Sequence, residues 1–462
     1  MASDLDALRR DLARLIGSEG VLEPHAYEAY AHDATIQRGL RGTPDAVVCP
    51  ADARSVARVL AWCYDHDVAL VPRGGGTGLA GGAVPVGGGV VCSLERLNRI
   101  LEIEPQLWRM SVQAGVLTAH VHRLARENGL MFAPDPGAAE QSQIGGNIAT
   151  NAAGPHAFKY GPTGGFVSGL EVVLAPGEIT NLGAKVSKDV AGYDLRGLLV
   201  GSEGTLGVVT AAHLRLLPAP TQTEAVAVVL EGVEQGQRLL LELIGSGIRP
   251  AVLEFLDEAA LSAAARSFPG ELGAEARFML LLELDGTGEE LARESAELRD
   301  LLKDAAPLGL LQPNPSALWR WRAGLNGAIA AQRGGKVSED ISVPVEHLAR
   351  AIEGVHRIGS EHGLATCTFG HAGDGVLHAT FMVDLQDEQE TSRALAAAQA
   401  ALRLAITLEG SVTGEHGCGW VKRTQLAQQL GPAALAAHWL IKDSLDPKGL
   451  LNPGKKLLQR PG

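Results

Sequence analysis

The chain has 462 residues, of which 46% are hydrophobic and 20% charged, with a formal net charge of -13. This length favours two or three globular domains. The acidic balance and the lack of a dense basic stripe argue against nucleic acid as a partner. The N-terminal segment carries acidic residues, and no apolar run approaches the roughly 18 residues that span a bilayer, so we expect a cytoplasmic chain without a transmembrane segment.

The first elements in chain order are two helices and a strand. Apolar spacing predicts helices over 3–16 and 55–66, the second capped by Asp52, and a strand over 68–71. Glycine, at 57 residues, is concentrated in the first 210 positions. Close approach of backbone to phosphate requires glycine, so this half of the chain is the candidate nucleotide-binding part.

The segment 72–89 contains Gly76, Gly78 and Gly81 in the G-x-G-x-x-G spacing of a dinucleotide fold. That fold requires a helix to begin at the third glycine, and the glycines and proline that follow here forbid one. We therefore predict a loop whose backbone N–H groups hold phosphate, with Arg73 supplying positive charge.

Three small-residue loops occur in the first half of the chain. Downstream of the first loop we predict strands over 90–94 and 108–112, a helix over 118–128, an irregular second loop over 133–154, a strand within 165–174, and a loop and strand over 201–210. Each loop alone is compatible with surface turns. Together they favour an extended cofactor.

The amino-acid composition changes after Pro218 and Pro220, where glycines become fewer. Strands over 226–230, 251–255 and 278–284 and helices over 288–303 and 345–361 predict an α+β second domain. Glycine returns from about residue 409. We expect a first domain over 1–217, a substrate or cap domain over 218–408, and a C-terminal segment over 409–462 that rejoins the first domain.

Two histidines stand seven residues apart in the segment GHAGDGVLH, at His371 and His378. Gly373 and Gly375 suit a tight turn between two strands, and such a hairpin can bring both imidazoles to one side. Taken alone, the two histidines are more often ordinary surface or core residues than ligands.

The segment TGEHGCG adds Glu415 and His416. Glu415 completes a two-histidine, one-carboxylate set typical of zinc enzymes with an open coordination position, and iron(II) and manganese accept much the same ligands. His416, with its side chain directed away from the ligands, is the candidate general base. Cys418 is interpreted as a packing residue, because the five cysteines are scattered without a C-x-x-C pair.

Six motifs in order and spacing then resemble one family along nearly the whole chain: PRGGGTG, IGGNIATNAAG, GSEGTLGVVT, GHAGDG, GEHG and LNPGK. The chain resembles the FAD-linked D-2-hydroxy acid dehydrogenases, which include D-lactate and D-2-hydroxyglutarate dehydrogenases and the glycolate oxidase flavoprotein subunit, in the vanillyl-alcohol oxidase and p-cresol methylhydroxylase superfamily. The resemblance implies an α+β fold: a two-part FAD-binding domain of p-cresol methylhydroxylase type and an α+β cap domain with an antiparallel sheet.

The resemblance also implies the cofactors. FAD is expected to be non-covalent, because the first loop lacks the histidine to which some members attach it. The metal ligands fall on His371, His378 and Glu415, with zinc expected and manganese or iron as alternatives. The FAD contacts implied by the family are Arg73, Gly74, Gly75, Gly76, Thr77, Gly78, Pro134, Asp135, Gly145, Gly146, Asn147, Thr150, Glu203, Gly204, Val209 and Asn452.

Catalytic and substrate residues follow from the same resemblance. The catalytic histidine falls on His416, and the substrate carboxylate residues fall on Arg322 and, allowing one deletion, Lys336. Taken alone, Arg322 beside tryptophan would be read as a surface charge. Three positions depart from the family pattern and are expected to line the pocket or adjust its specificity: Asn326, Val376 and Thr380.

The implied activity is oxidation of a D-2-hydroxy acid to the 2-oxo acid, with hydride passing to flavin N5. The expected partners are a small 2-hydroxy acid and an electron acceptor, which is a quinone, an electron-transfer flavoprotein, a partner subunit or oxygen. A homodimer is the candidate assembly. Two alternatives are a non-catalytic flavin-binding subunit of a glycolate-oxidase-like complex and a metal hydrolase, the latter leaving the flavin-like loops unexplained.

Overall fold

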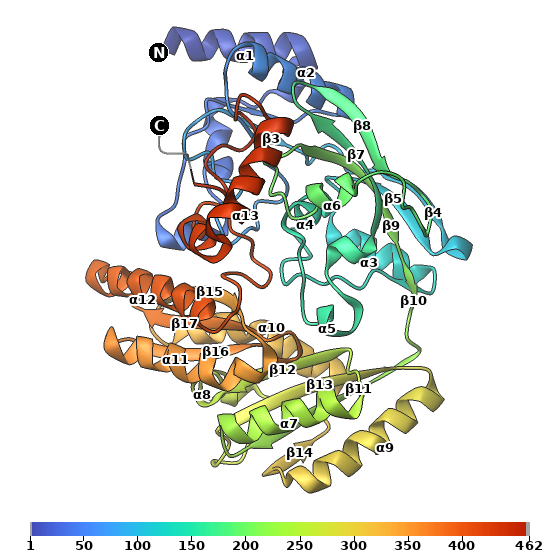
Figure 1. Cartoon of the computed structure of the whole chain (residues 1–462), viewed down its shortest axis with the longest axis vertical. Helices are drawn as coiled ribbons and strands as arrows, with labels where there is room; N and C mark the ends of the chain where they lie inside the picture. The colour runs from blue at the N-terminus through green and yellow to red at the C-terminus, as the bar shows by residue number, and fades with distance from the viewer. Residues whose placement is uncertain (1, 459–462) are drawn as a thin grey trace. The chain divides into compact units, whose positions relative to one another are not determined.

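The computed structural model describes residues 2–458, which form two compact units (Figure 1). Unit 1 comprises the chain up to Ala153, Pro162–Ala219 and the segment from Glu415 onward. Unit 2 comprises Gly154–Gly161 and Pro220–Gly414. The first domain was expected to run without interruption to residue 217, whereas the structure groups a short excursion, residues 154–161, with unit 2.

The predicted helices and strands of unit 1 occur in the expected order, and the structure adds elements that were not predicted. The helices are α1 (Ala2–Ile16), α2 (Ala53–Asp65), α3 (Thr118–Glu127), α4 (Ile144–Thr150), α6 (Leu195–Leu199) and α13 (Arg423–Leu445). The strands are β1 (Ala46–Val48), β2 (Leu70–Arg73), β3 (Val90–Ser93), β4 (Ile100–Glu104), β5 (Arg109–Gln113), β6 (Leu130–Met131), β7 (Val167–Leu174), β8 (Glu178–Gly183), β9 (Val208–Arg215) and β10 (Leu217–Pro218).

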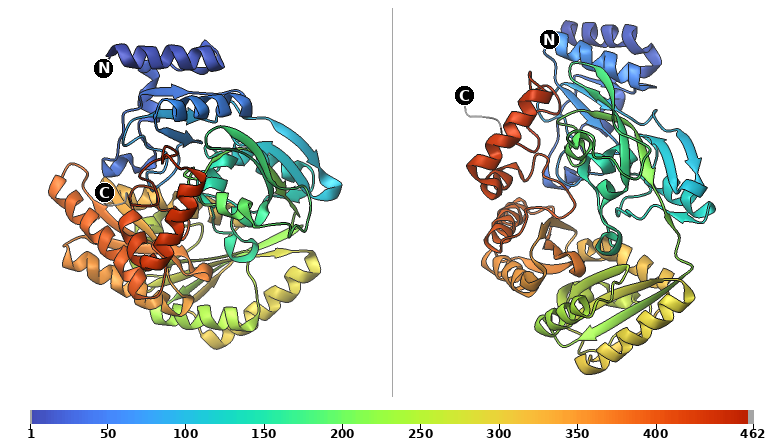
Figure 2. Two further views of the ribbon diagram at one scale, coloured as in Figure 1. Left: turned by 45° about the horizontal axis from the view of Figure 1, so that its top comes forward. Right: turned by 45° about the vertical axis from the view of Figure 1, so that its right-hand side comes forward.

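Unit 1 contains two main sheets. A parallel sheet has the order β1-β3-β2, and an antiparallel sheet has the order β4-β5-β9-β7-β8. The C-terminal segment returns to this unit (Figure 2). There, Leu451 forms a β-bridge with Leu70 at the start of β2. As predicted, Asp52 caps α2 by accepting a hydrogen bond from the Ser55 amide at 2.7 Å.

The glycine-rich segment after β2 forms no helix, as the sequence predicted. The second small-residue loop differs from the prediction, because it contains the short helix α4. Tertiary contacts explain this helix: a Cβ on Gly145 would lie 2.7 Å from the Ala114 Cβ, and Asn147 Nδ2 donates to Thr118 Oγ1 at 2.6 Å. Packing therefore overrides the low helix propensity of the sequence.

Unit 2 is an α+β domain. Its helices are α5 (Ala157–Tyr160), α7 (Val233–Ser246), α8 (Glu258–Ala264), α9 (Gly288–Ala305), α10 (Pro315–Ala331), α11 (Leu348–Glu361) and α12 (Glu388–Thr407). Its strands are β11 (Gln222–Leu230), β12 (Val252–Asp257), β13 (Phe278–Gly286), β14 (Gly309–Leu311), β15 (Gly335–Ser342), β16 (Ala365–His371) and β17 (Val376–Val383).

The strands of unit 2 form one antiparallel seven-stranded sheet in the order β14-β11-β13-β12-β16-β17-β15. Helices α8 and α10 cover one face, where Leu318, Trp321 and Leu325 of α10 join a buried apolar cluster with Leu281 and Cys367 of the sheet. Helices α7 and α11 lie on the opposite side, with α11 beside α12 (Figures 1 and 2). The expected antiparallel sheet of the cap domain is thus confirmed.

Candidate active site

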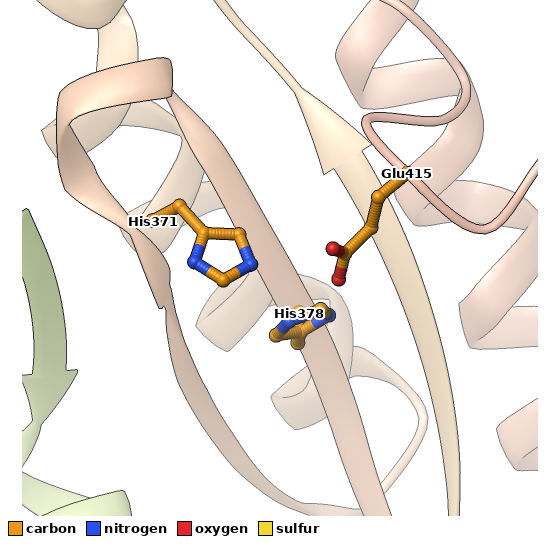
Figure 3. A group of neighbouring side chains, drawn as sticks. All are labelled: His371, His378 and Glu415. Carbon is orange, nitrogen blue, oxygen red and sulfur yellow. The ribbon is translucent and has the colours of Figure 1, made fainter. Parts of the chain in front are cut away.

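The two predicted ligand histidines lie on a β-hairpin. Figure 3 shows the side chains of His371 and His378. Strands β16 and β17 pair antiparallel, with His371 directly opposite Val376. The turn between them contains Gly375 with φ 66°, and a Cβ there would lie 2.0 Å from the Val343 carbonyl oxygen. Only glycine fits this position, so the predicted tight turn is confirmed.

Cross-strand register gathers the polar residues on one face of the sheet. One row across the strands contains Asp340, His378 and Phe369, and the adjacent row contains His371 and Glu254. Side chains at alternate positions of a strand share a face, so both rows project from the same side. That side is the one covered by α8 and α10, because Phe369 belongs to their apolar cluster.

The two residues immediately before Glu415 are hydrogen-bonded to strand β15 of unit 2. The Gly414 amide donates to Asp340 Oδ2 at 2.8 Å, and the Thr413 hydroxyl donates to the same oxygen at 2.8 Å. Asp340 in turn lies directly opposite His378. The start of the Glu415 segment is therefore fixed relative to the histidine hairpin.

The ligand atoms of His371, His378 and Glu415 all lie within 4.8 Å of one another. The two histidines are buried, and the Glu415 side chain is 15% exposed. Two imidazole nitrogens and one carboxylate oxygen at this separation fit a divalent cation that keeps further coordination positions open. Manganese and iron(II) accept the same donors as zinc.

His416 lies beside the carboxylate of Glu415. Its Nε2 atom is 3.5 Å from Glu415 Oε1, although the sequence predicted that it would point away from the ligands. The two residues lie in a bend rather than in a strand, so successive side chains do not alternate between opposite sides. This position leaves an imidazole next to the ligand set, as a proton acceptor for a bound hydroxyl requires.

Arg322 is buried at 9% exposure, which rules out the surface-charge interpretation. Its Nε atom donates to Glu254 Oε2 at 2.8 Å, and Nη2 forms an ion pair with the same oxygen. The other oxygen of Glu254 is hydrogen-bonded to His371 Nδ1. Burial raises the pKa of the Glu254 carboxyl, but Arg322 and His371 hold it below its usual range.

Phe369 forms the common wall of this cluster. The guanidinium carbon of Arg322 lies 5.1 Å from the ring centroid, and Lys336 Nζ lies 5.8 Å from it. The His378 ring centroid is 5.0 Å away. Lys336 Nζ also donates to Asn326 Oδ1. The structure therefore brings both predicted carboxylate-binding cations to the ring beside His378, a predicted metal ligand, and places Asn326 next to Lys336.

Thr380 and Val376 flank His378 at alternate positions of β17. Thr380 is 0% exposed, and its hydroxyl pairs with Ser338 Oγ at 2.8 Å. Val376 is 7% exposed and lies opposite His371. Both share the face of His378, although Thr380 is bonded within the sheet.

Two glycine-rich loops of unit 1 approach each other. A Cβ on Gly74 would lie 3.4 Å from the Gly146 Cα atom, whereas a Cβ on Gly146 would meet no atom within 4 Å. In contrast, a Cβ on Gly75 would collide with the Gln141 carbonyl oxygen at 2.1 Å. Protein packing thus explains Gly75 but not Gly146, where bare backbone beside open space suits a phosphate-bearing cofactor.

Other predicted FAD residues contact protein atoms. The Arg73 guanidinium donates to the carbonyl oxygens of His32 at 2.7 Å and Ala29 at 2.9 Å. Glu203 accepts from the amides of Cys418 and Gly419 at 2.9 and 2.6 Å. Pro134, Asn147, Thr150 and Asn452 also form hydrogen bonds with protein atoms.

Sequence reasoning missed the two buried carboxylates of this site, Glu254 and Asp340. Both are 0% exposed. Glu254 is an acid inside a strand whose neighbours are largely apolar, and that signal could have singled it out. Asp340 lies in a strand of mixed polarity, next to Glu339, and offers no such signal. Their partners lie far away in sequence, so the pattern could not have shown what they contact.

Comparison with known proteins identifies two families. Residues 219–456 match the family described as FAD linked oxidases, C-terminal domain, and residues 44–183 match the family described as FAD binding domain. Together the two matches span most of both units.

Three relatives match the chain over nearly its whole length. The glycolate oxidase subunit GlcD of Bacillus subtilis is 37% identical over 97% of this chain and 96% of that protein. The D-lactate dehydrogenase of Anaerostipes hadrus is 33% identical, covering 93% and 92%. The D-2-hydroxyglutarate dehydrogenase of Stutzerimonas stutzeri is 32% identical, covering 97% and 98%.

Among solved structures, p-cresol methylhydroxylase superposes with a TM-score of 0.83 at 18% identity, covering 99% of this chain and 98% of that one. This likeness confirms the expected fold. Within residues 2–458, no helix is long and apolar enough to cross a membrane.

Proposed function

Because the chain belongs to the FAD-linked oxidase family, we propose that it oxidises a D-2-hydroxy acid to the 2-oxo acid, with non-covalent FAD and a divalent metal as cofactors. The names of the relatives support the 2-hydroxy acid class. The observation that carries the proposal is the cluster around Phe369, where two cations adjoin a two-histidine, one-carboxylate set.

Substrate binding is assigned to residues of unit 2. Arg322 and Lys336 would bind the substrate carboxylate, with the planar guanidinium fixing its orientation. The 2-hydroxyl would then lie toward His371, His378 and Glu415, because hydroxyl and carboxylate are carried by adjacent carbon atoms. Holding the substrate in this orientation lowers the activation free energy of the reaction substantially.

The chemistry requires the hydroxyl proton and the C2 hydride to leave together. When bound, the metal at His371, His378 and Glu415 would supply Lewis-acid stabilisation and FAD the hydride acceptor. His416 would accept the hydroxyl proton at Nε2, a contribution of about 10²–10⁴-fold for a positioned base. Buried walls such as Phe369 would exclude water from the cations and strengthen their hold on the carboxylate.

The proposed electron acceptor is external: a quinone, an electron-transfer flavoprotein or a partner subunit. The substrate class spans short and long D-2-hydroxy acids. Lys336 beside Arg322 favours a second carboxylate, as in D-2-hydroxyglutarate or D-malate. Against this, Thr380 departs from the pattern of the 2-hydroxyglutarate enzymes, and Val376 departs from that of close relatives.

The test is anaerobic reduction of the purified yellow protein by D-lactate, glycolate, D-malate and D-2-hydroxyglutarate, followed by loss of the flavin absorption bands. We expect at least one acid to bleach the flavin. Removal of metal by a chelator should abolish bleaching while the flavin stays bound, because the ligands lie outside the flavin loops. Bleaching by metal-depleted protein at the original rate would contradict the metal assignment.

Two adjacent variants separate the proposed roles. Glu415→Ala should lose both metal and flavin reduction, whereas His416→Ala should retain metal and lose most of the reduction rate. Glu361→Ala, which removes an exposed carboxylate on α11, is the matched control and should behave as wild type. A His416→Ala protein that reduces its flavin at the wild-type rate would remove His416 from the mechanism.

A flavin-binding subunit without catalysis of its own is the second candidate, which the name of the GlcD relative favours. The same experiment decides between them. A yellow, metal-loaded chain that none of the four acids reduces would support the subunit.

A further inference from the structure

Glu254 is a buried carboxylate with two different partners. It lies in the middle of β12 between Leu253 and Phe255, and its side chain is 0% exposed. A carboxylate in such surroundings costs several kcal/mol unless it is paired and fully hydrogen-bonded. Here Oε1 contacts His371 Nδ1, and Oε2 accepts from Arg322 Nε at 2.8 Å.

The fold fixes both contacts independently of any ligand. Glu254 stands directly opposite His371 in the β12–β16 register, so the sheet sets their separation. Arg322 comes from the central part of α10, which is held against the same face by Leu318 and Leu325, both 0% exposed. One carboxylate thereby joins a sheet residue to a helix residue.

The contact with His371 decides which ring nitrogen can bind metal. A carboxylate accepts hydrogen bonds, so the proton of the neutral imidazole resides on Nδ1 and the lone pair on Nε2. Carboxylate–histidine pairs of this kind orient metal ligands in many proteins, and their removal typically lowers metal affinity about 10–100-fold. Without Glu254 the ring would lose its preferred tautomer and its orientation.

The contact with Glu254 restrains the position of the Arg322 guanidinium group. Both the Nε and Nη2 atoms of Arg322 engage the same oxygen of Glu254, which restrains the side chain through a charge-assisted contact. The guanidinium carbon is held 5.1 Å from the Phe369 ring centroid. Glu254 therefore sets the position of the cation proposed to bind substrate.

We propose that Glu254 is a positioning residue that holds a metal-ligand histidine and a substrate-binding arginine in fixed register, His371 through one oxygen and Arg322 through the other. This inference rests on the proposed function for the roles of these two partners. It adds that metal affinity and substrate affinity depend on the same buried side chain, which contacts neither metal nor substrate.

Glu254→Gln is the informative variant, because it preserves shape and removes the charge. The glutamine amide offers one acceptor oxygen and one NH₂ donor. Either His371 Nδ1–H or the Arg322 guanidinium group would therefore face the NH₂ group, which cannot accept its hydrogen bond. We expect the dissociation constant for Zn²⁺ or Mn²⁺, measured by chelator competition, to rise about 10–100-fold. We also expect KM for the best D-2-hydroxy acid to rise several-fold in fully metal-loaded enzyme.

A second readout does not require metal. Nitrogen NMR of ¹⁵N-histidine-labelled, metal-free wild-type protein should show His371 as a single Nδ1–H tautomer, assigned by its loss in His371→Gln. Glu254→Gln should shift this signal toward a mixture of tautomers. Glu254→Asp keeps the charge on a shorter side chain and should give intermediate metal affinity, which preserves the test if Glu254→Gln folds poorly.

Asp257→Asn provides the matched control. Asp257 is a buried carboxylate on the same strand, 3% exposed, that accepts from the Ala260 amide at 2.8 Å and from Thr368. It should lower thermal stability without changing metal affinity or the His371 tautomer. Bound flavin, measured by absorbance, should equal wild type in every folded variant.

The outcomes separate this inference from the proposed function. If wild type binds Zn²⁺ and Glu254→Gln binds it equally well with an unchanged His371 tautomer, the positioning role is overturned. If wild type binds neither Zn²⁺ nor Mn²⁺, the metal part of the proposed function fails, and the metal-affinity claim fails with it. Tighter metal binding by wild type than by Glu254→Gln, with no difference for Asp257→Asn, supports the inference.

Discussion

At the scale of single residues, Arg73 in the first glycine loop has a structural role in addition to its predicted contact with FAD. Arg73 is buried, and its guanidinium holds two backbone carbonyl groups. Gly76 adopts φ 68°, and a Cβ there would lie 2.1 Å from the Arg73 guanidinium. Glycine at this position is therefore required by arginine as well as by the turn.

The composition of the loop over 73–82 bears on whether FAD would be attached covalently. It contains no histidine, so no imidazole is present there to form a covalent bond to FAD. We predict that acid or heat denaturation releases intact FAD into the supernatant, measured by absorbance and chromatography. A precipitate that stays yellow after washing would contradict the prediction.

His356 links stability of unit 2 to pH. Its Nε2 atom lies 2.7 Å from Asp257 Oδ2, and the hydrogen bond to Asp257 raises the pKa of His356 above its ordinary 6.5, with burial opposing. A raised folded-state pKa stabilises the fold fully below 6.5, and this contribution disappears as pH rises through the folded-state pKa.

We therefore predict that His356→Gln lowers the melting temperature more at acidic than at alkaline pH. Melting curves of wild type and variant at pH values well below and well above 6.5 test this. His347→Gln, at the start of α11, is the control for general effects of histidine loss. An equal difference in melting temperature at both pH values would show that the ion pair does not contribute.

At the scale of elements, the site depends on how the 411–414 segment is attached to β15. Ser411 and Ser342 exchange backbone hydrogen bonds of 2.7 and 3.0 Å, and Asp340 accepts hydrogen bonds from Thr413 and Gly414. These contacts end immediately before Glu415. The predicted third ligand, Glu415, thus follows a segment that is bonded to the edge strand β15.

We predict that Asp340→Ala weakens metal binding at least tenfold, because it releases the segment that carries Glu415. It should also cost about 1–3 kcal/mol of stability, since the Gly414 amide loses its acceptor. Asp340→Asn keeps an acceptor oxygen and should lose less of both. Chelator competition and chemical denaturation measure the two effects, and wild-type metal affinity in Asp340→Ala would refute the anchoring role.

At the scale of the whole molecule, the chain leaves unit 1 after α4, contributes residues 154–161 to unit 2 and then returns. Within unit 2, Lys159 and the Tyr160 hydroxyl contact the Asp285 carboxylate, the latter at 2.6 Å. Phe158 lies against the ligand hairpin, because a Cβ on Gly373 would be 2.5 Å from its ring. The excursion thereby contacts the turn between His371 and His378.

We predict that Asp285→Ala loosens this excursion, because two donors lose a carboxylate that is only 2% exposed. Hydrogen exchange within 154–161 should accelerate, and flavin content should stay unchanged. Asp300→Ala, which removes a solvent-exposed ion pair with Lys303, is the matched control and should alter neither. Unchanged exchange in Asp285→Ala would show that the excursion is held by other contacts.

The sequence by itself was sufficient for elements whose signal is local. Apolar periodicity and a capping residue located α1, α2 and α3 within two residues of their bounds, and glycine spacing located the hairpin between His371 and His378. Local sterics and short-range hydrogen bonds decide these features, so a single segment carries the information. The ordered motifs similarly indicated the family that the comparisons then showed.

Only the tertiary structure decided the features that depend on distant partners. Nothing near α4 in sequence predicts its contact with Thr118, and nothing near Glu254 shows that His371 and Arg322 will meet its two oxygens. The surroundings of a buried charge are set by sheet register and helix packing across more than a hundred residues. Local pattern therefore identifies the chemical groups, whereas the fold determines which of them act together.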